Sequence, residues 1–354
     1  MSRAGEAIRD LHPAYFAMVM ATGIVSIACE LLALPLLARG LFGTNVVCAT
    51  ALVLLLAVRI SRYPGQVLAD LQHHGRAVGF FTMVAAASVL GTQAVLISHA
   101  WKWGVALWAL AIALWVVLTY TIFTLLTVKA EKPALDAGIN GGWLVSVVAP
   151  QSIVVLGAQL APGFGAAAAT VLFFSLVIWL GAGMLYIWII SLIFYRYTFF
   201  VLSPGDLAPP YWINMGAVAI STLAGSALVL AASASPLLTE LLPFIKGLTL
   251  LFWATATWWI PMLLILGVWR HIVRRFPLRY DPLYWGAVFP LGMYTVCTFR
   301  LAQALDVPIL MRIPAVGVWI ALAAWAVTFA GLLGEITRFS RGGWVERQQL
   351  EKGV

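Results

Sequence analysis

Long apolar stretches run along almost the whole chain and are separated by short segments that contain Pro, Gly and charged residues. A helix needs about 20 apolar residues to cross the hydrocarbon core of a bilayer. The pattern therefore predicts one domain of ten membrane-spanning helices, residues 1–336, and a polar cytoplasmic tail, residues 337–354. The expected spans are residues 12–34, 42–60, 77–98, 101–128, 141–160, 166–195, 211–232, 244–269, 283–304 and 314–334.

The odd-numbered and even-numbered spans differ in the side chains that they carry. Twelve of the 16 tryptophans lie in spans four, six, eight and ten, where large aromatic side chains suit contact with lipid. The odd-numbered spans hold hydroxyls, amides and mid-span prolines instead. These candidate pore-lining residues are Thr22, Ser26, Thr82, Ser88, Thr92, Gln93, Ser146, Pro150, Gln151, Asn214, Ser221, Pro290, Thr295 and Thr298.

This alternation predicts an all-α integral membrane protein made of five helical hairpins. Five polar helices would form an inner pore, and five outer helices would surround it. The alternative is an ordinary helix bundle, in which small polar residues only allow the helices to pack closely. Repetition of the same alternation through five hairpins favours the inner pore.

The ninth span combines several of these features in the stretch from Asp281 to Arg300. A turn signal at Asp281-Pro282 precedes an aromatic pair, and a Phe289-Pro290 break interrupts the apolar run. Small and hydroxyl-bearing residues follow the break. We expect a helix that lines a path through the membrane, with Phe289 as the candidate plug.

The composition indicates an integral membrane protein. Hydrophobic residues make up 63% of the 354 residues and charged residues only 10%, whereas a soluble domain carries roughly 25% charged residues. With ten spans, 16 of the 21 Lys and Arg residues lie on the side of the termini. This predicts a multi-pass protein of the plasma (inner) membrane with both termini in the cytoplasm. The net charge of +8 then reflects topology and does not indicate a nucleic-acid partner.

No acidic residue falls near the middle of any expected span, and this absence narrows the class of ion that the protein could transport. Proton and cation relays use carboxylates within the membrane, so the sequence favours anions. The cysteines and histidines lack metal-site spacing, and GxSxG, HExxH and P-loop motifs are missing, so we expect no enzyme, metal or cofactor. Arg300, near the outer end of the ninth span, is a candidate for attracting anions, with snorkelling to the interface as the alternative.

Three stretches of the odd-numbered spans are HPAYFAMVMATGIVS (residues 12–26), GGWLVSVVAPQSIV (141–154) and YDPLYWGAVFPLGMYTV (280–296). Together they resemble the tellurite-resistance/C4-dicarboxylate transporter family, which includes plant slow anion channels and fungal malate and sulfite exporters. The resemblance implies five hairpins around a central pore, in a homotrimer with one pore per subunit. It also implies that Phe289 occludes the pore. The segments around Phe16, Thr22 and Pro150 match pore-lining segments of the family.

We therefore expect a channel or facilitator in the lipid bilayer that passes small anions passively, with Phe289 as the constriction. The expected cargo is chloride-like or nitrate-like anions, sulfite, or monoanionic C4-dicarboxylates such as malate. The alternative is a proton-coupled secondary transporter, exporter or importer, of C4-dicarboxylates or sulfite. A third interpretation is a membrane protein without a transport role. Flux into liposomes, measured with and without a pH gradient, separates the three.

Overall fold

The computed structural model describes residues 3–340, and every regular element over these residues is a helix. The prediction of an all-α protein is confirmed. Ten of the described helices have 15 or more residues. They are α2 (Ala17–Leu31), α3 (Pro35–Arg62), α6 (Phe81–Ser98), α7 (Trp101–Val128), α9 (Val145–Leu160), α10 (Ala168–Phe199), α11 (Ile213–Leu230), α13 (Leu242–Val268), α14 (Trp285–Leu305) and α15 (Arg312–Ser340).

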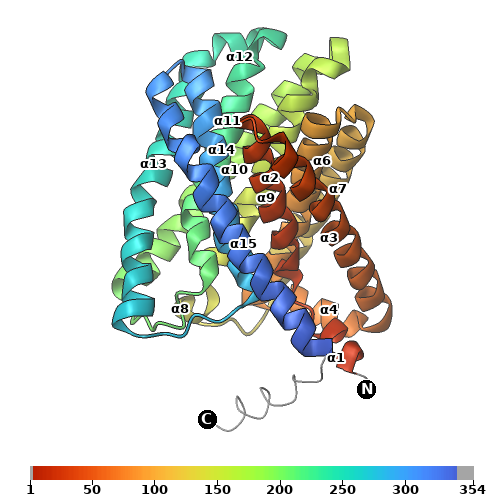
Figure 1. Ribbon diagram of the computed structural model, residues 1–354, viewed down its shortest axis with the longest axis vertical. Coiled ribbons are helices and arrows are strands. Elements are labelled where there is room, and N and C mark those ends of the chain that lie inside the picture. The colour runs from red at the N-terminus through yellow and green to blue at the C-terminus, as the bar shows by residue number, and fades with distance from the viewer. Residues whose placement is uncertain (1–2, 341–354) are drawn as a thin grey trace.

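Short elements connect the long helices (Figure 1). The short α-helices are α1 (Arg3–Arg9), α4 (Pro64–Leu71), α5 (His74–Ala77), α8 (Leu135–Gly138) and α12 (Pro236–Glu240). Figure 1 places α1 and the last turn of α15 at one end of the molecule and α12 at the opposite end. The expected tail, residues 337–354, begins within α15, and its residues 341–354 lie outside the described residues.

Eight helical stretches among residues 3–340 are long and apolar enough to cross a membrane, judged by length and composition. One of them, Gly141–Phe199, contains both α9 and α10, which are separated by a kink at Gly165 with φ +54°. That φ is in the left-handed region, which glycine adopts without steric cost. The 21-residue α14 is not among the eight, because its Gly, Thr and Arg residues lower its mean hydropathy. The chain is therefore a membrane protein with many apolar helices.

The apolar helices fall into two groups by burial. In the stretches that contain α2, α6 and α11, 78%, 67% and 83% of the most apolar window is buried inside the protein. The corresponding share is 17% or 22% in the stretches of α3, α7, α13 and α15. These exposed helices carry large apolar side chains such as Trp103, Val117 and Leu251 on their surface, as helices in contact with lipid do. The Trp-rich helices therefore lie outside the hydroxyl-rich ones.

The buried helices form a closed ring. α2 packs against α6, α6 against α9, α9 against α11, α11 against α14, and α14 packs back against α2. Each ring helix also packs against the long helix that follows it in the chain, which is α3, α7, α10, α13 or α15. Figure 1 shows α15 crossing in front of this ring, with α3 on one side of it and α13 on the other.

A side-chain hydrogen bond ties each outer helix to the ring helix that follows it in the chain, and the last outer helix is tied in the same way to the first ring helix. In the last of these links, Trp325 Nε1 of α15 donates to Thr22 Oγ1 of α2 over 2.9 Å. The other links run from Asn45 Nδ2 to Gln93 Oε1, from Trp108 Nε1 to the Ile153 carbonyl, from Trp179 Nε1 to the Ser221 carbonyl and from Trp253 Nε1 to Thr298 Oγ1. A buried donor without an acceptor costs about 1–3 kcal/mol, so these bonds fix how each outer helix faces the ring.

All five ring helices begin at the same end of the ring. Each starts with a short 3₁₀ turn, and these turns are η1 (Pro13–Phe16), η2 (Val78–Phe80), η3 (Gly141–Leu144), η5 (Pro209–Trp212) and η8 (Pro282–Tyr284). The turns contact one another in the same circular order as the helices. Side chains of His12, Asn140 and Asp281 accept backbone N–H groups that the first turn leaves without partners. The ring helices are therefore parallel.

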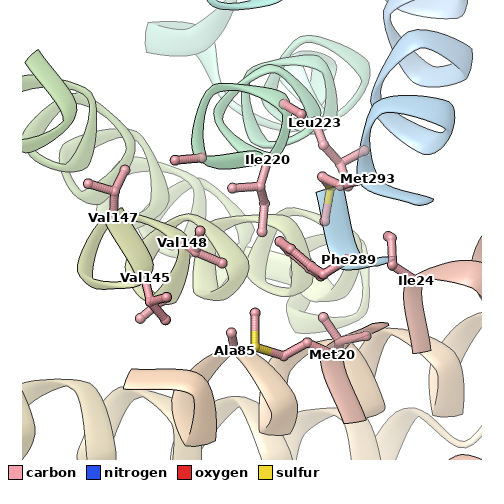
Figure 2. Packing of buried hydrophobic residues seen from close by; sticks show 14 of the residues in the cluster. Met20, Ile24, Ala85, Val145, Val147, Val148, Ile220, Leu223, Phe289 and Met293 are labelled. Carbon is pink, nitrogen blue, oxygen red and sulfur yellow. The ribbon is translucent and has the colours of Figure 1, made fainter. Parts of the chain in front are cut away.

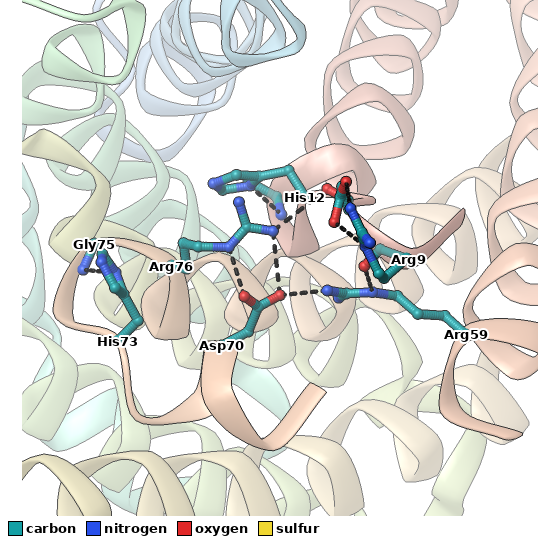
Figure 3. Close-up of polar contacts among 9 residues, drawn as sticks. Arg9, His12, Arg59, Asp70, His73, Gly75 and Arg76 are labelled. Carbon is teal, nitrogen blue, oxygen red and sulfur yellow. Dashed lines mark hydrogen bonds and ion pairs between the residues drawn. The ribbon is translucent and has the colours of Figure 1, made fainter. Parts of the chain in front are cut away.

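A buried ion cluster joins α3, α4 and α5 beside the start of α2 (Figure 3). Asp70 accepts from Arg59 Nη2 at Oδ2 and from Arg76 Nε at Oδ1, each over 2.6 Å. The side chains of Arg59 and Asp70 are only 1% and 3% exposed. Arg59 Nε also donates to the carbonyl of Arg9 over 3.0 Å, which attaches α1 to the cluster. The cluster thus holds the segment that leads into the first ring helix.

Gly216 allows α11 to pack closely against Pro290 of α14. A Cβ at position 216 would lie 2.7 Å from Cγ and 3.1 Å from Cβ of Pro290. Because the proline ring is rigid, we expect Gly216→Ala to push the two helices apart and to lower the melting temperature in detergent. Gly181→Ala on α10 is the control, since no atom lies within 4 Å of the added Cβ. Equal melting temperatures for the two variants would contradict this close packing.

Candidate functional site

Phe289 lies at the centre of the ring, and its side chain is only 1% exposed. Figure 2 shows the ring of Phe289 projecting from α14 among side chains of the other four ring helices. Its neighbours in this view are Met20 and Ile24 of α2, Ala85 of α6, Val148 of α9, Ile220 of α11 and Met293 of its own helix. We call these residues, with Phe289, the central apolar layer. A layer of this composition offers a hydrated ion no polar partner.

One cavity lies on each side of the central apolar layer. The amino-end cavity, of about 100 Å³, is lined by the first turns of all five ring helices. The carboxyl-end cavity, of about 260 Å³, is lined by the second halves of the same helices. Neighbouring lining residues of the two cavities are Met20 and Ile24, Val148 and Ser152, and Phe289 and Met293. Each pair spans one helical turn, so the layer between the cavities is roughly 5 Å thick.

The two cavities are mainly apolar and differ in their charged lining residues. Asp206 lines the amino-end cavity, and Arg300 lines the carboxyl-end cavity. Asp206 accepts from the backbone N–H and the hydroxyl of Ser203 over 2.8 and 2.7 Å and forms an ion pair with Arg196. These hydrogen bonds, with the Arg196 charge, hold the pKa of Asp206 below its ordinary value. Asp206 is therefore ionised at neutral pH.

The serine and threonine hydroxyls that line the cavities donate their protons to backbone carbonyls about one turn earlier in the chain. Thr82 Oγ1 donates to the Gly79 carbonyl over 2.6 Å, and Thr92 Oγ1 donates to the Ser88 carbonyl over 3.0 Å. Ser152 Oγ donates to the Ala149 carbonyl over 2.6 Å. A hydroxyl has one proton, so each of these groups must rotate before it can donate to an anion.

Four residues singled out from the sequence line a cavity, namely Thr82, Thr92, Phe289 and Arg300. Others bond to outer helices. In addition to the bonds of Thr22, Gln93 and Thr298 described above, Ser26 donates to the Ala38 carbonyl, Gln151 to the Trp179 carbonyl and Asn214 to Tyr197. These six polar side chains tie the ring to the helices outside it.

The remaining residues singled out from the sequence lie within their own helices. Ser146, Ser221 and Thr295 donate to the carbonyls of Trp143, Ala217 and Leu291. Ser88 is buried, and its hydroxyl has no hydrogen-bond partner among residues 3–340. Pro150 and Pro290 lie inside α9 and α14, and Phe16 is buried at the end of η1.

Sequence reasoning missed several residues at the site. Met20, Ile24, Val148 and Met293 belong to the central apolar layer, yet an apolar residue beside a cavity looks the same in the sequence as one in a packed core. Asp206 lies between two spans. The sequence marks it only as an acidic residue close to the boundary of an expected span. Among the described residues, no group of three His, Cys, Asp or Glu side chains is placed to hold a metal ion.

A ring of parallel apolar helices with a cavity on each side of one apolar layer is an arrangement that fits a membrane channel or transporter. Comparison with known families agrees with this class. The sequence profile described as voltage-dependent anion channel (SLAC1) matches residues 10–333. The chain belongs to this family, whose members are anion channels and transporters rather than enzymes. The resemblance seen in the sequence is therefore confirmed.

Three related proteins, from an archaeon and a bacterium, match either most of the chain or part of it. An uncharacterized transporter of Methanocaldococcus jannaschii is 28% identical over 330 residues, which cover 91% of this chain and 92% of the relative. A second uncharacterized transporter of that organism is 26% identical over 336 residues, covering 93% and 96%. An uncharacterized membrane protein of Mycobacterium tuberculosis is 43% identical over 149 residues, covering 42% of this chain and 75% of the relative.

Proposed function

We propose that this protein is an anion channel or facilitator that passes small anions through the centre of the ring. The supporting observation is that two cavities, lined by the same five helices, are separated only by the central apolar layer. The cargo is chloride, nitrate, sulfite or a monoanionic C4-dicarboxylate such as malate. Flow is passive, and Phe289 is the gate, because its ring fills the layer in this closed structure.

The proposed arrangement in the membrane has ten spans in five hairpins. The five ring helices are the pore, the five outer helices contact lipid, and three subunits assemble, each with its own pore. Both termini are in the cytoplasm of a cell with the protein in its plasma (inner) membrane. The amino-end cavity then opens to the cytoplasm, because α1 and η1 lie at that end of the ring.

The parallel ring helices favour anions at the cytoplasmic mouth. Each helix amino end carries roughly half a positive charge, and five such ends converge around the amino-end cavity. Among residues 3–340, no acidic side chain lines the carboxyl-end cavity or belongs to the central apolar layer. The one carboxylate of the amino-end cavity, Asp206, is paired with Arg196. A cation would meet no opposite charge at the layer.

The alternative, a proton-coupled transporter of C4-dicarboxylates or sulfite, needs a group on the path that binds and releases protons. Among the residues that line the cavities, His12 and Asp206 are the titratable groups of this kind. Both lie on the amino-end side, and the lowered pKa of Asp206 keeps it ionised at neutral pH. No His, Asp or Glu is among the described residues that line the carboxyl-end cavity, which favours passive flow.

Anion flux into proteoliposomes tests the proposal. We expect uptake of chloride, nitrate, sulfite and malate to follow the electrochemical gradient of each anion, with or without a pH gradient. Protein-free liposomes and uptake of potassium are the controls. Uptake that stops when the pH gradient is removed would establish the proton-coupled alternative. A complete lack of anion uptake would support the interpretation of a membrane protein without a transport role.

A further inference from the structure

The carboxyl-end cavity is surrounded by the ends of four of the ring helices and by the second half of α14. Leu31 and Leu230, the last residues of α2 and α11, line it, and so do Leu96 and Gln159 in the last turns of α6 and α9. At about 260 Å³, the cavity is several times larger than the roughly 30 Å³ that one water molecule occupies in the liquid. An anion therefore fits there together with part of its hydration shell.

The direction of the ring helices makes this cavity unfavourable for anions. A helix carboxyl end carries roughly half a negative charge, from carbonyl groups that have no intrahelical partner. The ring helices are parallel, so their negative ends meet here, just as their positive ends meet at the amino-end cavity. The effect is strongest within the last turn of a helix, which is where the lining residues Leu31, Leu230 and Gln159 lie.

Arg300 is the one charged residue among those that line this cavity. It lies on α14, five residues before the helix ends at Leu305, and it is half-buried. Within residues 3–340 its guanidinium makes one side-chain hydrogen bond, from Nη1 to Gln303 Oε1 over 3.0 Å. A guanidinium has five N–H donors, so several remain for a ligand.

The other polar lining residues supply no comparable donor. The hydroxyls of Thr92 and Ser152 already donate to carbonyls of their own helices. Gln159 is uncharged: its amide N–H groups can donate, but its buried side-chain oxygen, which has no hydrogen-bond partner among the described residues, repels an anion. Among the described residues that line this cavity, Arg300 therefore has the only charged donor group.

We propose that Arg300 makes the carboxyl-end cavity a loading site for compact monovalent anions such as chloride and nitrate. Its charge offsets the negative ends of the four ring helices that end at this cavity, and its N–H groups replace part of the water around the anion. The inference rests on the proposed function, because it concerns the same path. It adds that Arg300 sets how readily anions enter from the carboxyl end, and so the asymmetry of the current.

Single-channel recordings in planar bilayers test this inference. A single channel has one orientation in the bilayer. The ratio of its currents at two opposite voltages can therefore be compared between variants even when the orientation is not known. In the Phe289→Ala background at low salt, we expect Arg300→Gln to reduce the current for anions entering from one side by about three- to tenfold. Arg300→Lys should retain most of it. The difference in current between Arg300→Gln and its Phe289→Ala background should shrink near 1 M salt, where the Debye length falls to roughly 3 Å.

Arg312→Gln is the matched control. Arg312 begins α15 on the same side of the membrane, is exposed and does not line the cavity. Equal asymmetry for Arg300→Gln and its background would overturn the inference, and so would an equal loss in Arg312→Gln. If Arg300→Gln does not fold, the Phe289→Ala channel alone provides the test. A ratio of its currents at opposite voltages that does not change with salt would then overturn the inference. Absence of anion current from both wild type and Phe289→Ala would overturn the proposed function as well.

Discussion

Phe289→Ala is expected to raise the anion conductance several-fold, in protein that remains folded. The side chain of Phe289 fills the central apolar layer, which is about one helical turn thick, and it is the only aromatic side chain among the residues that define that layer. Removing the ring joins the amino-end and carboxyl-end cavities into one path. Conductance in planar bilayers, or the initial rate of anion uptake into proteoliposomes, measures the effect.

Phe81→Ala is the matched control for this experiment. Phe81 is also on a ring helix and fully buried, but its ring lies 6.0 Å from that of Phe123 on the outer helix α7. Truncating a buried phenylalanine costs about 3–5 kcal/mol through lost packing and the cavity left behind. Phe81→Ala should therefore lower stability without raising conductance. An equal rise in both variants would mean that loosened packing, not an open gate, carries the current, and an unchanged current in well-folded Phe289→Ala would refute the gate.

Asp70→Asn is expected to cause the largest loss of stability among single polar substitutions. The carboxylate neutralises Arg59, which is almost fully buried, and it also binds Arg76 (Figure 3). Asparagine removes the charge and leaves the Arg59 guanidinium buried without a counter-ion, which costs about 3–5 kcal/mol. The melting temperature in detergent, compared at one heating rate because unfolding of such proteins is often irreversible, measures the effect.

The Arg9–Asp10 pair provides the control for Asp70→Asn. Its atoms are 2.8 Å apart, but the two side chains are 43% and 53% exposed. Water screens an exposed ion pair, so Asp10→Asn should leave the melting temperature almost unchanged. Similar melting temperatures for Asp70→Asn and Asp10→Asn would show that the buried cluster does not hold the amino-terminal segment in place.

The helical architecture could be predicted because it follows from residue types that sequence displays directly. The length of the apolar stretches predicts the helices. The separation of tryptophans from hydroxyl-bearing residues predicts which helices are exposed and which are buried. α14 could be predicted from its turn signal and its Phe289-Pro290 break, although its composition alone is too polar to mark it as a span.

The direction of each polar side chain could not be predicted. A ring helix is buried on nearly all sides, so its sequence has no exposed face from which to read the inward direction. Thr22 and Thr298 were expected at a pore surface, and in the structure they accept hydrogen bonds from Trp325 and Trp253 of outer helices. The burial of Arg59 and Asp70 was equally hidden, because in sequence they belong to a short charged connection between two spans.

The bond between Trp325 and Thr22 has a consequence for biosynthesis. Its two residues are 303 positions apart, and it links the last long helix to the first ring helix. A ribosome adds about 5–20 residues per second, so the first ring helix waits on the order of 15–60 s for this partner. During that time the nascent ring is open between α2 and α14. A factor that covers the unpaired face of α2 in the membrane would act only until α14 and α15 have been synthesised.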